Sequence, residues 1–131
     1  MSWPGTLGGV TESVVTTLGP NERWNVAALG LHAEADAADP VRARTWGRTR
    51  TWRNFTERGE GYVQFTRDPV DFTDAALAVR EEDEQILDSA SARAEVRVEQ
   101  PAAGEEDATQ WVDWALHVVS SEVRARSVQT V

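Results

Sequence analysis

The sequence predicts a mainly β protein, an antiparallel barrel that is closed or partly closed, with short connecting helices. Several short segments are rich in β-branched and aromatic residues and are separated by turn residues. Helices are predicted in two short stretches, 49–58 and 68–79, where apolar residues have helical spacing. Closing such a sheet removes the exposed strand edges that would otherwise pair with other chains.

The N-terminal part of the chain predicts a hairpin. Gly and Pro punctuate residues 1–10, which we expect to be a flexible lead-in. Glu12–Leu18 is rich in β-branched residues, Gly19–Glu22 has turn chemistry, and Trp24–Leu31 forms the second strand. This second strand leaves room for a flat molecule to approach its backbone, because it contains the small residues Ala27, Ala28 and Gly30.

The middle of the chain alternates between strands and short helices. Ala33–Pro40 is an acidic connector, and Val41–Trp46 predicts a third strand. Thr49–Arg58 predicts a short helix, because Trp52 and Phe55 are three residues apart and share one face.

A strand and a second helix follow. Gly59 and Gly61 end the first helix, and Tyr62–Thr66 predicts a strand. Asp68–Pro69 is typical of a helix start, since Asp accepts a backbone N–H and Pro is tolerated at the first helical position. The apolar face of this helix consists of Phe72, Ala75, Ala76 and Val79.

Two more strands are predicted near the C-terminus. The charged run Glu81–Glu84 indicates solvated surface, and Ala92–Glu99 alternates cleanly between apolar and charged residues, as a strand does. Pro101–Asp107 is predicted to be a polar loop. Trp111–Val119 fits both spacings; we favour a strand over a helix, with a bulge near Ser120–Ser121.

Length and residue types exclude several classes of protein. With 131 residues the chain fits a single domain, 1–131. It has no cysteine, which excludes disulfides, thiolate nucleophiles and cysteine-ligated metals. It has no lysine, which removes Schiff-base enzymes and P-loop ATPases.

The charge of the chain bears on its partners and its surroundings. The formal net charge is −9, spread along the sequence, and every basic residue is Arg. This is typical of a halophilic protein kept soluble in concentrated salt, with an acidic protein from a GC-rich genome as the alternative. Either origin argues against nucleic-acid binding. Val26–Leu31 is the longest apolar run and is far shorter than the roughly 20 residues of a membrane helix. No signal peptide is visible, so we expect a cytoplasmic protein that binds no membrane.

Arginines, threonines and aromatic residues interleave between Thr45 and Phe55 in this acidic chain. A guanidinium presents a planar fork of donors that matches phosphate oxygens, and threonine hydroxyls add further donors. A helix beginning near Thr49 or Thr51 would also direct free backbone N–H groups at an anion. The cluster predicts a phosphate site, with a surface corner of internal ion pairs as the alternative.

Four segments together resemble one known family. They are Glu12–Thr17, Trp24–Gly30, Thr49–Phe55 and Gly61–Val70, and they appear in family order. The chain is similar over most of Glu12–Ala76 to an archaeal family of FMN-binding split-barrel proteins, with a flavin reductase or pyridoxamine phosphate oxidase-like fold. The resemblance implies a six-stranded antiparallel split barrel, a homodimer, and FMN bound at the dimer interface.

The resemblance also implies which residues bind the cofactor. The family segment that meets the flavin phosphate is matched here by Thr49, Arg50, Thr51 and Asn54. The isoalloxazine ring would lie beside the second strand, at Asn25, Ala27 and Ala28. Gln64 stands where the family often has Asn, as a further polar contact. Members of the family continue with a further, largely helical segment beyond the part that this chain matches.

Other residues are weaker candidates. His32 and His117 lie far apart and without the spacing of a metal site. No serine lies in the G-x-S-x-G sequence of a hydrolase, and no side chain stands out as an acid or base. We interpret most of the tryptophans as core or dimer-interface residues, although a flavin ring could stack on Trp24, Trp46 or Trp52.

Three functions stay open from the sequence. The first is an FMN-dependent oxidoreductase that exchanges electrons with a small molecule, with enzymes of this fold that use deazaflavin or pyridoxamine phosphate as variants. The second is a non-catalytic flavin-binding carrier. The third is a ligand-free dimeric interaction domain whose arginines make only internal ion pairs.

Overall fold

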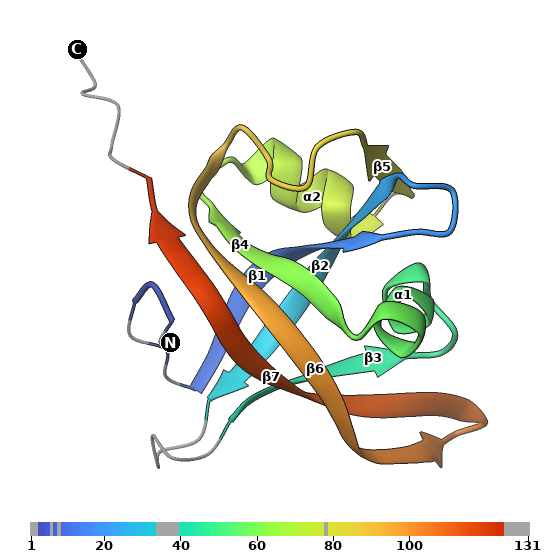
Figure 1. The fold of residues 1–131 in the computed structure, drawn as a ribbon. Helices are drawn as coiled ribbons and strands as arrows, with labels where there is room; N and C mark the ends of the chain where they lie inside the picture. Colours follow the sequence, from blue (N-terminus) through green and yellow to red (C-terminus); the bar gives the residue numbers. More distant parts are fainter. Residues whose placement is uncertain (1–2, 6, 8, 34–39, 78, 125–131) are drawn as a thin grey trace.

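The computed structural model describes residues 3–5, 7, 9–33, 40–77 and 79–124. Within these residues the chain forms seven strands and two helices (Figure 1). Their order is β1 (Gly9–Leu18), β2 (Trp24–Ala33), β3 (Val41–Trp46), α1 (Arg50–Arg58), β4 (Glu60–Thr66), α2 (Pro69–Leu77), β5 (Arg80–Glu82), β6 (Ala90–Glu106) and β7 (Thr109–Val123).

Six of the strands close into an antiparallel barrel. Their order in the sheet is β1-β4-β6-β7-β3-β2, and a further pairing between β1 and β2 closes the ring. The predicted six-stranded barrel is therefore confirmed. The short strand β5 is an addition, and it pairs with the start of β2 at Trp24–Val26.

The barrel is split between β2 and β3. These strands share a single pair of residues, His32 and Arg42, whereas β3 pairs with β7 along its whole length. From that pair the two strands diverge, and α1 lies at the open end between them (Figure 1). In the pairings of the described strands, the second edge of β2 has no strand neighbour from Ala27 to Leu31.

The core fills the barrel and extends to α1. The inward side chains of the strands form one buried cluster, to which α1 contributes Phe55. The ring of Phe55 meets that of Trp114 from β7 edge to face, with 5.2 Å between the centroids. Helix α1 thus packs on the barrel core through Phe55, and the half-buried Trp52 also packs against the cluster.

The predicted start and end of α1 and the predicted start of α2 are confirmed, whereas α2 ends at Leu77 and leaves Val79, predicted on its apolar face, outside the helix and exposed, with Ala76 also exposed. Thr49 caps α1 by accepting a hydrogen bond from the backbone N–H of Trp52, and Gly59 ends the helix in a left-handed conformation with φ 68°. At the start of α2, the carboxylate of Asp68 accepts hydrogen bonds from the backbone N–H groups of Val70 and Asp71.

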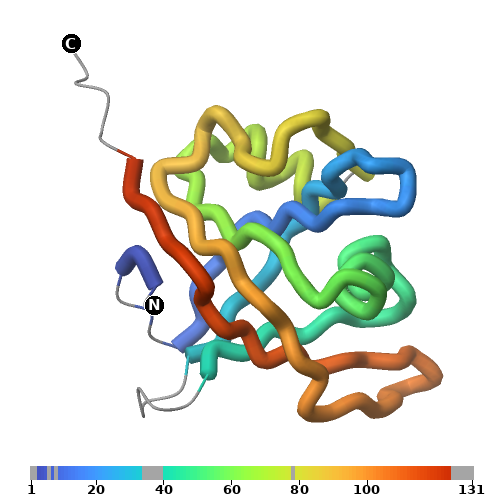
Figure 2. The backbone as a smooth tube through the Cα atoms, in the orientation of Figure 1, coloured from blue at the N-terminus to red at the C-terminus, as the bar shows by residue number. Residues whose placement is uncertain are grey.

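The structure corrects two predictions of irregular chain. Pro101–Asp107 is not a loop, because β6 continues to Glu106 and pairs with β7 as far as Thr109. This hairpin projects beyond the barrel (Figure 2), so its residues are exposed on both faces and show no apolar alternation. Glu81–Glu84 is not only solvated surface, because Arg80–Glu82 pairs with β2.

The strand prediction for Trp111–Val119 is confirmed. The register between β6 and β7 shifts where Glu95 pairs with Ser120 and Val96 pairs with Val118, so a bulge lies at Val119, next to the predicted position. Most of the predicted connector, 34–39, lies outside the described residues, as does part of the lead-in. Of the lead-in, Trp3 and Leu7 pack against the core cluster.

Candidate functional site

The edge of β2 has the small residues that a flat ligand would need. Ala27, Ala28 and Gly30 are half-buried, and a Cβ built on Gly30 would meet no atom within 4 Å. Asn25 is buried, and its backbone pairs with Glu81 of β5. The open part of the edge therefore begins after β5, at Ala27, and runs toward His32.

The N-terminus of α1 lies beside the start of β2. The Arg50 guanidinium is 3.6 Å from the carboxylate of Glu81, and Glu81 is the register partner of Asn25. The structure thus brings the predicted phosphate residues and the predicted ring strand to one corner of the barrel. Thr49 and Arg50 are exposed there, and the backbone N–H groups of Arg50 and Thr51 belong to the first helical turn, which has no partners within the helix.

The other two predicted phosphate residues face the barrel instead of solvent. Thr51 and Asn54 are only 4% and 1% exposed. The Asn54 side-chain amide donates to the hydroxyl of Thr17 at 3.0 Å and accepts from Arg53 at 3.0 Å. The bond to Thr17 ties α1 to β1, so Asn54 has a structural role whether or not it also contacts a ligand.

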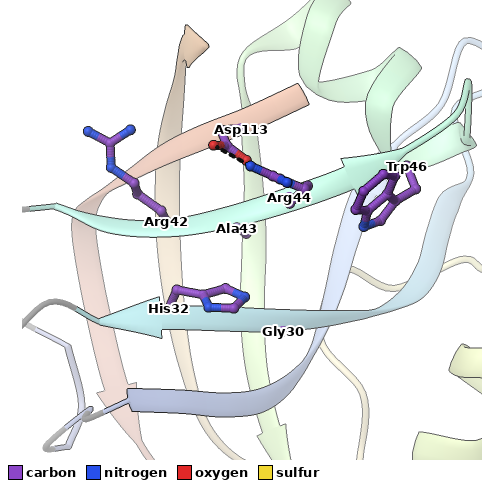
Figure 3. A pocket seen from close by; sticks show the side chains of 7 residues that line it. All are labelled: Gly30, His32, Arg42, Ala43, Arg44, Trp46 and Asp113. Atoms are coloured by element: carbon purple, nitrogen blue, oxygen red, sulfur yellow. Dashed lines mark hydrogen bonds and ion pairs between the residues drawn. The ribbon is translucent and has the colours of Figure 1, made fainter. Parts of the chain in front are cut away.

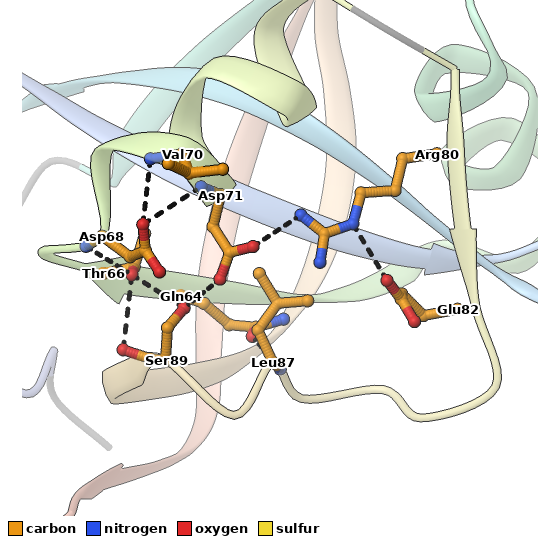
Figure 4. Close-up of polar contacts among 9 residues, drawn as sticks. All are labelled: Gln64, Thr66, Asp68, Val70, Asp71, Arg80, Glu82, Leu87 and Ser89. Carbon is orange, nitrogen blue, oxygen red and sulfur yellow. Dashed lines mark hydrogen bonds and ion pairs between the residues drawn. The ribbon is translucent and has the colours of Figure 1, made fainter.

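Gln64 lies apart from this corner. It is fully buried on β4, where its amide nitrogen donates to the Thr16 hydroxyl and to the Gln85 carbonyl oxygen, and its amide oxygen accepts from the backbone N–H of Leu87. Figure 4 shows it beside the polar contacts at the start of α2. A flavin contact at Gln64 stays a prediction, and it would require the amide to give up one of these bonds.

A cavity of about 540 Å³ opens on the outer face of the barrel, along the split between β2 and β3. Figure 3 shows Arg42, Arg44 and Trp46 along β3, with His32 and Gly30 below them on β2. The described residues that line it are Gly30, His32, Arg42, Ala43, Arg44, Trp46 and Asp113. From the sequence alone, His32 is a candidate only as a metal ligand, and no local pattern marks Arg42, Arg44 or Asp113 as site residues.

One side of this cavity is held rigid by a stacked ion pair. Arg44 binds the carboxylate of Asp113 through two nitrogens, at 2.7 and 3.1 Å. The guanidinium also lies over the ring of Trp111, 4.0 Å from its centroid, and 5.5 Å from that of Trp46. The hydrogen bond from Arg44 is the main reason that the pKa of Asp113 lies below its ordinary value.

The described part of the chain shows neither a metal site nor a membrane-spanning helix. No group of three or more His, Cys, Asp or Glu side chains there could hold a metal ion. Among the same residues, neither helix is long and apolar enough to cross a membrane.

Residues 11–125 match the family described as protein of unknown function (DUF447), N-terminal domain. The chain belongs to the DUF447 family. The match spans all of the strands except the first residues of β1. None of the curated proteins matches the chain in sequence.

Solved structures similar to this DUF447 chain share its split-barrel fold. An FMN-bound DUF447 protein from Methanosarcina mazei is 17% identical, with a TM-score of 0.74, and the match covers 97% of this chain and 67% of that one. The styrene monooxygenase flavin reductase from Pseudomonas putida S12 is 13% identical, with a TM-score of 0.56 and coverages of 87% and 82%. A flavoredoxin from Methanosarcina acetivorans is 12% identical, with a TM-score of 0.57 and coverages of 86% and 68%.

Proposed function

We propose that this DUF447 chain is an FMN-binding flavoprotein and that it acts as an oxidoreductase on a small molecule. The observation that carries the proposal is the corner where the N-terminus of α1 meets the start of β2. There an exposed arginine, Arg50, and free first-turn N–H groups lie beside a strand edge with small side chains. The FMN-bound family member from Methanosarcina mazei has the same fold.

The chain's residues fit FMN in two parts. Thr49 and Arg50 would hold the phosphate, because both are exposed and carry hydrogen-bond donors. The ring would lie along Ala27, Ala28 and Gly30, where the edge of β2 is open. Thr51 and Asn54 would act mainly by fixing α1, since their side chains are buried.

Bound FMN would supply the redox chemistry, and the protein would supply position and electrostatics. The described residues offer a stacking surface at Trp46, which is 46% exposed at the end of β3. The flavin reductases among the similar structures favour an oxidoreductase over a carrier. We further propose a homodimer, because the outer face with Trp46 and the Arg44–Trp111 stack would gain from a second copy covering it.

The absorption spectrum of protein mixed with FMN and then freed of unbound flavin tests this function. We expect a retained flavin spectrum at one FMN per chain, and reduction of that flavin by a chemical reductant without its release. A protein that leaves all of the flavin in the filtrate would exclude the proposal. Retention without electron transfer to any small acceptor would instead favour the carrier.

A further inference from the structure

The cavity between β2 and β3 extends past the contacts proposed for FMN. From Asn25, at the phosphate corner, to His32 is seven residues of strand, or about 23 Å at roughly 3.3 Å per residue. A flavin ring that lies along β2 from that corner meets Gly30 before His32. Gly30 also lines the cavity. The far end of the cavity, at His32 and Arg42, is therefore beyond the part of β2 assigned to the flavin.

His32 and Arg42 are placed to bind one group together. They are the single register pair between β2 and β3, so their side chains leave the sheet on the same face, with Cβ atoms about 5 Å apart. Both line the cavity. In the structure the Arg42 guanidinium points away from His32 (Figure 3); once this long side chain turns toward His32, the imidazole and the guanidinium can donate to the oxygens of one carboxylate or phosphate.

The charges around the cavity favour an anion at this end. Among the described lining residues Asp113 is the one carboxylate, and Arg44 holds it through two hydrogen bonds. Arg42 is thus a positive charge in the cavity lining without a carboxylate of its own there. This differs from the chain as a whole, whose net charge is −9. On β1, the exposed Glu12 pairs with Gly30, whereas His32 pairs with Val10, so the carboxylate of β1 lies beside Gly30 and not directly opposite His32.

We propose that the cavity binds a small organic anion, whose carboxylate or phosphate group is held by His32 and Arg42 and whose body reaches toward Gly30, where it would meet the flavin ring. We take this anion to be the substrate of the flavin, and this assignment rests on the proposed function. The binding itself does not, because His32 and Arg42 are separate from the FMN contacts.

The chain contains a matched control for this pair. Arg97 and His117 are also a register pair, between β6 and β7, and both are exposed. They do not line the cavity between β2 and β3, and Glu99 lies 3.5 Å from His117. Since the chain has two histidines, their ring signals in an NMR spectrum report on the two pairs separately.

The experiment follows both histidine signals in FMN-loaded and flavin-free protein, at constant pH and ionic strength. Inorganic phosphate, benzoate and the uncharged benzyl alcohol are the probes. We expect phosphate and benzoate to shift the His32 signal saturably and the His117 signal not at all, and benzyl alcohol to shift neither. Arg42→Gln should weaken both anions about tenfold or more, as loss of a charge-assisted contact does, whereas Arg97→Gln should change nothing. A preference for phosphate or benzoate identifies the anionic group.

Several outcomes would overturn the inference. An unmoved His32 signal in the wild-type protein would do so, whatever FMN does. So would an Arg42→Gln protein that loses FMN affinity in a flavin titration, because the pair would then serve the cofactor. By contrast, a protein that binds no FMN but shows the His32 shift supports the anion site and contradicts only the proposed function.

Discussion

The guanidinium of Arg50 lies 3.6 Å from the carboxylate of Glu81, which a neighbouring amide, that of Asn21, also holds at 2.9 Å. In the protein without FMN, the carboxylate of Glu81 therefore forms an ion pair with the arginine that we assign to the FMN phosphate. The Asn21 hydrogen bond, followed by the charges of Arg50, Arg23 and Arg53, keeps the pKa of Glu81 below its ordinary value. Glu81 is thus charged at neutral pH and competes with the phosphate.

Removal of this competing charge should strengthen FMN binding. We expect Glu81→Gln to lower the dissociation constant of FMN about two- to fivefold, a modest change because the pair is exposed to solvent. Asp83→Asn is the matched control, because this substitution removes one negative charge close to Glu81. Asp83 lies 3.8 Å from Arg23. Fluorescence titration measures both. Equal affinities for the Glu81→Gln and wild-type proteins would place the phosphate elsewhere.

Gln64 should matter for stability. Its side-chain amide is fully buried and bonds Thr16, Gln85 and Leu87. Gln64→Ala would leave these groups without a partner and open a cavity, so we expect a loss of about 2–5 kcal/mol in the free energy of unfolding. Urea unfolding of the flavin-free protein measures it. A loss below about 1 kcal/mol would show that water replaces the amide.

Asp71 should make the protein sensitive to acid. Hydrogen bonds from Ser89 and Arg80 lower the pKa of its carboxylate below 3.8 (Figure 4). A lowered folded pKa stabilises the fold above the ordinary value, and this contribution is lost as the pH falls through that value toward the folded pKa. Between about pH 5 and about pH 3, the wild-type protein should therefore lose more stability than Asp71→Asn. Parallel losses, measured by urea unfolding, would assign the acid sensitivity to other carboxylates.

The proposed homodimer is open to a direct measurement. We expect sedimentation in molar salt to show a dimer that stays associated at micromolar concentration. Trp46→Glu should yield monomers, because it places a charge on the exposed face that the second copy would cover. Thr56→Glu, on the exposed side of α1, is the control. A wild-type monomer that binds one FMN would contradict a site at a dimer interface.

Much of the fold follows from local patterns in the sequence. The strand Ala92–Glu99 was predictable because its apolar residues alternate and its neighbours cover one face. Both helix starts were predictable because a Thr or Asp cap leaves a local signature. The outer half of the β6–β7 hairpin was not, since residues exposed on both faces carry no alternation, and cross-strand pairing alone keeps them extended.

The candidate site was predictable only in part. Thr49 and Arg50 are exposed at the helix start, as a phosphate site requires, whereas the burial of Asn54 depends on Thr17, which is 37 residues away in the chain. The His32–Arg42 pair depends on the register between β2 and β3. Long-range contacts of this kind leave no local pattern in a single sequence.

The central claim is that this chain holds FMN through its phosphate at Arg50. Calorimetric titration of the wild-type and Arg50→Ala proteins with FMN and with riboflavin tests it most directly, with Arg53→Ala as the control for losing a nearby charge. We expect Arg50→Ala to weaken FMN about ten- to a hundredfold, to leave the weaker binding of riboflavin unchanged, and to exceed the effect of Arg53→Ala. A folded Arg50→Ala protein that binds FMN as the wild type does, or a wild type that binds riboflavin as tightly as FMN, would contradict the claim.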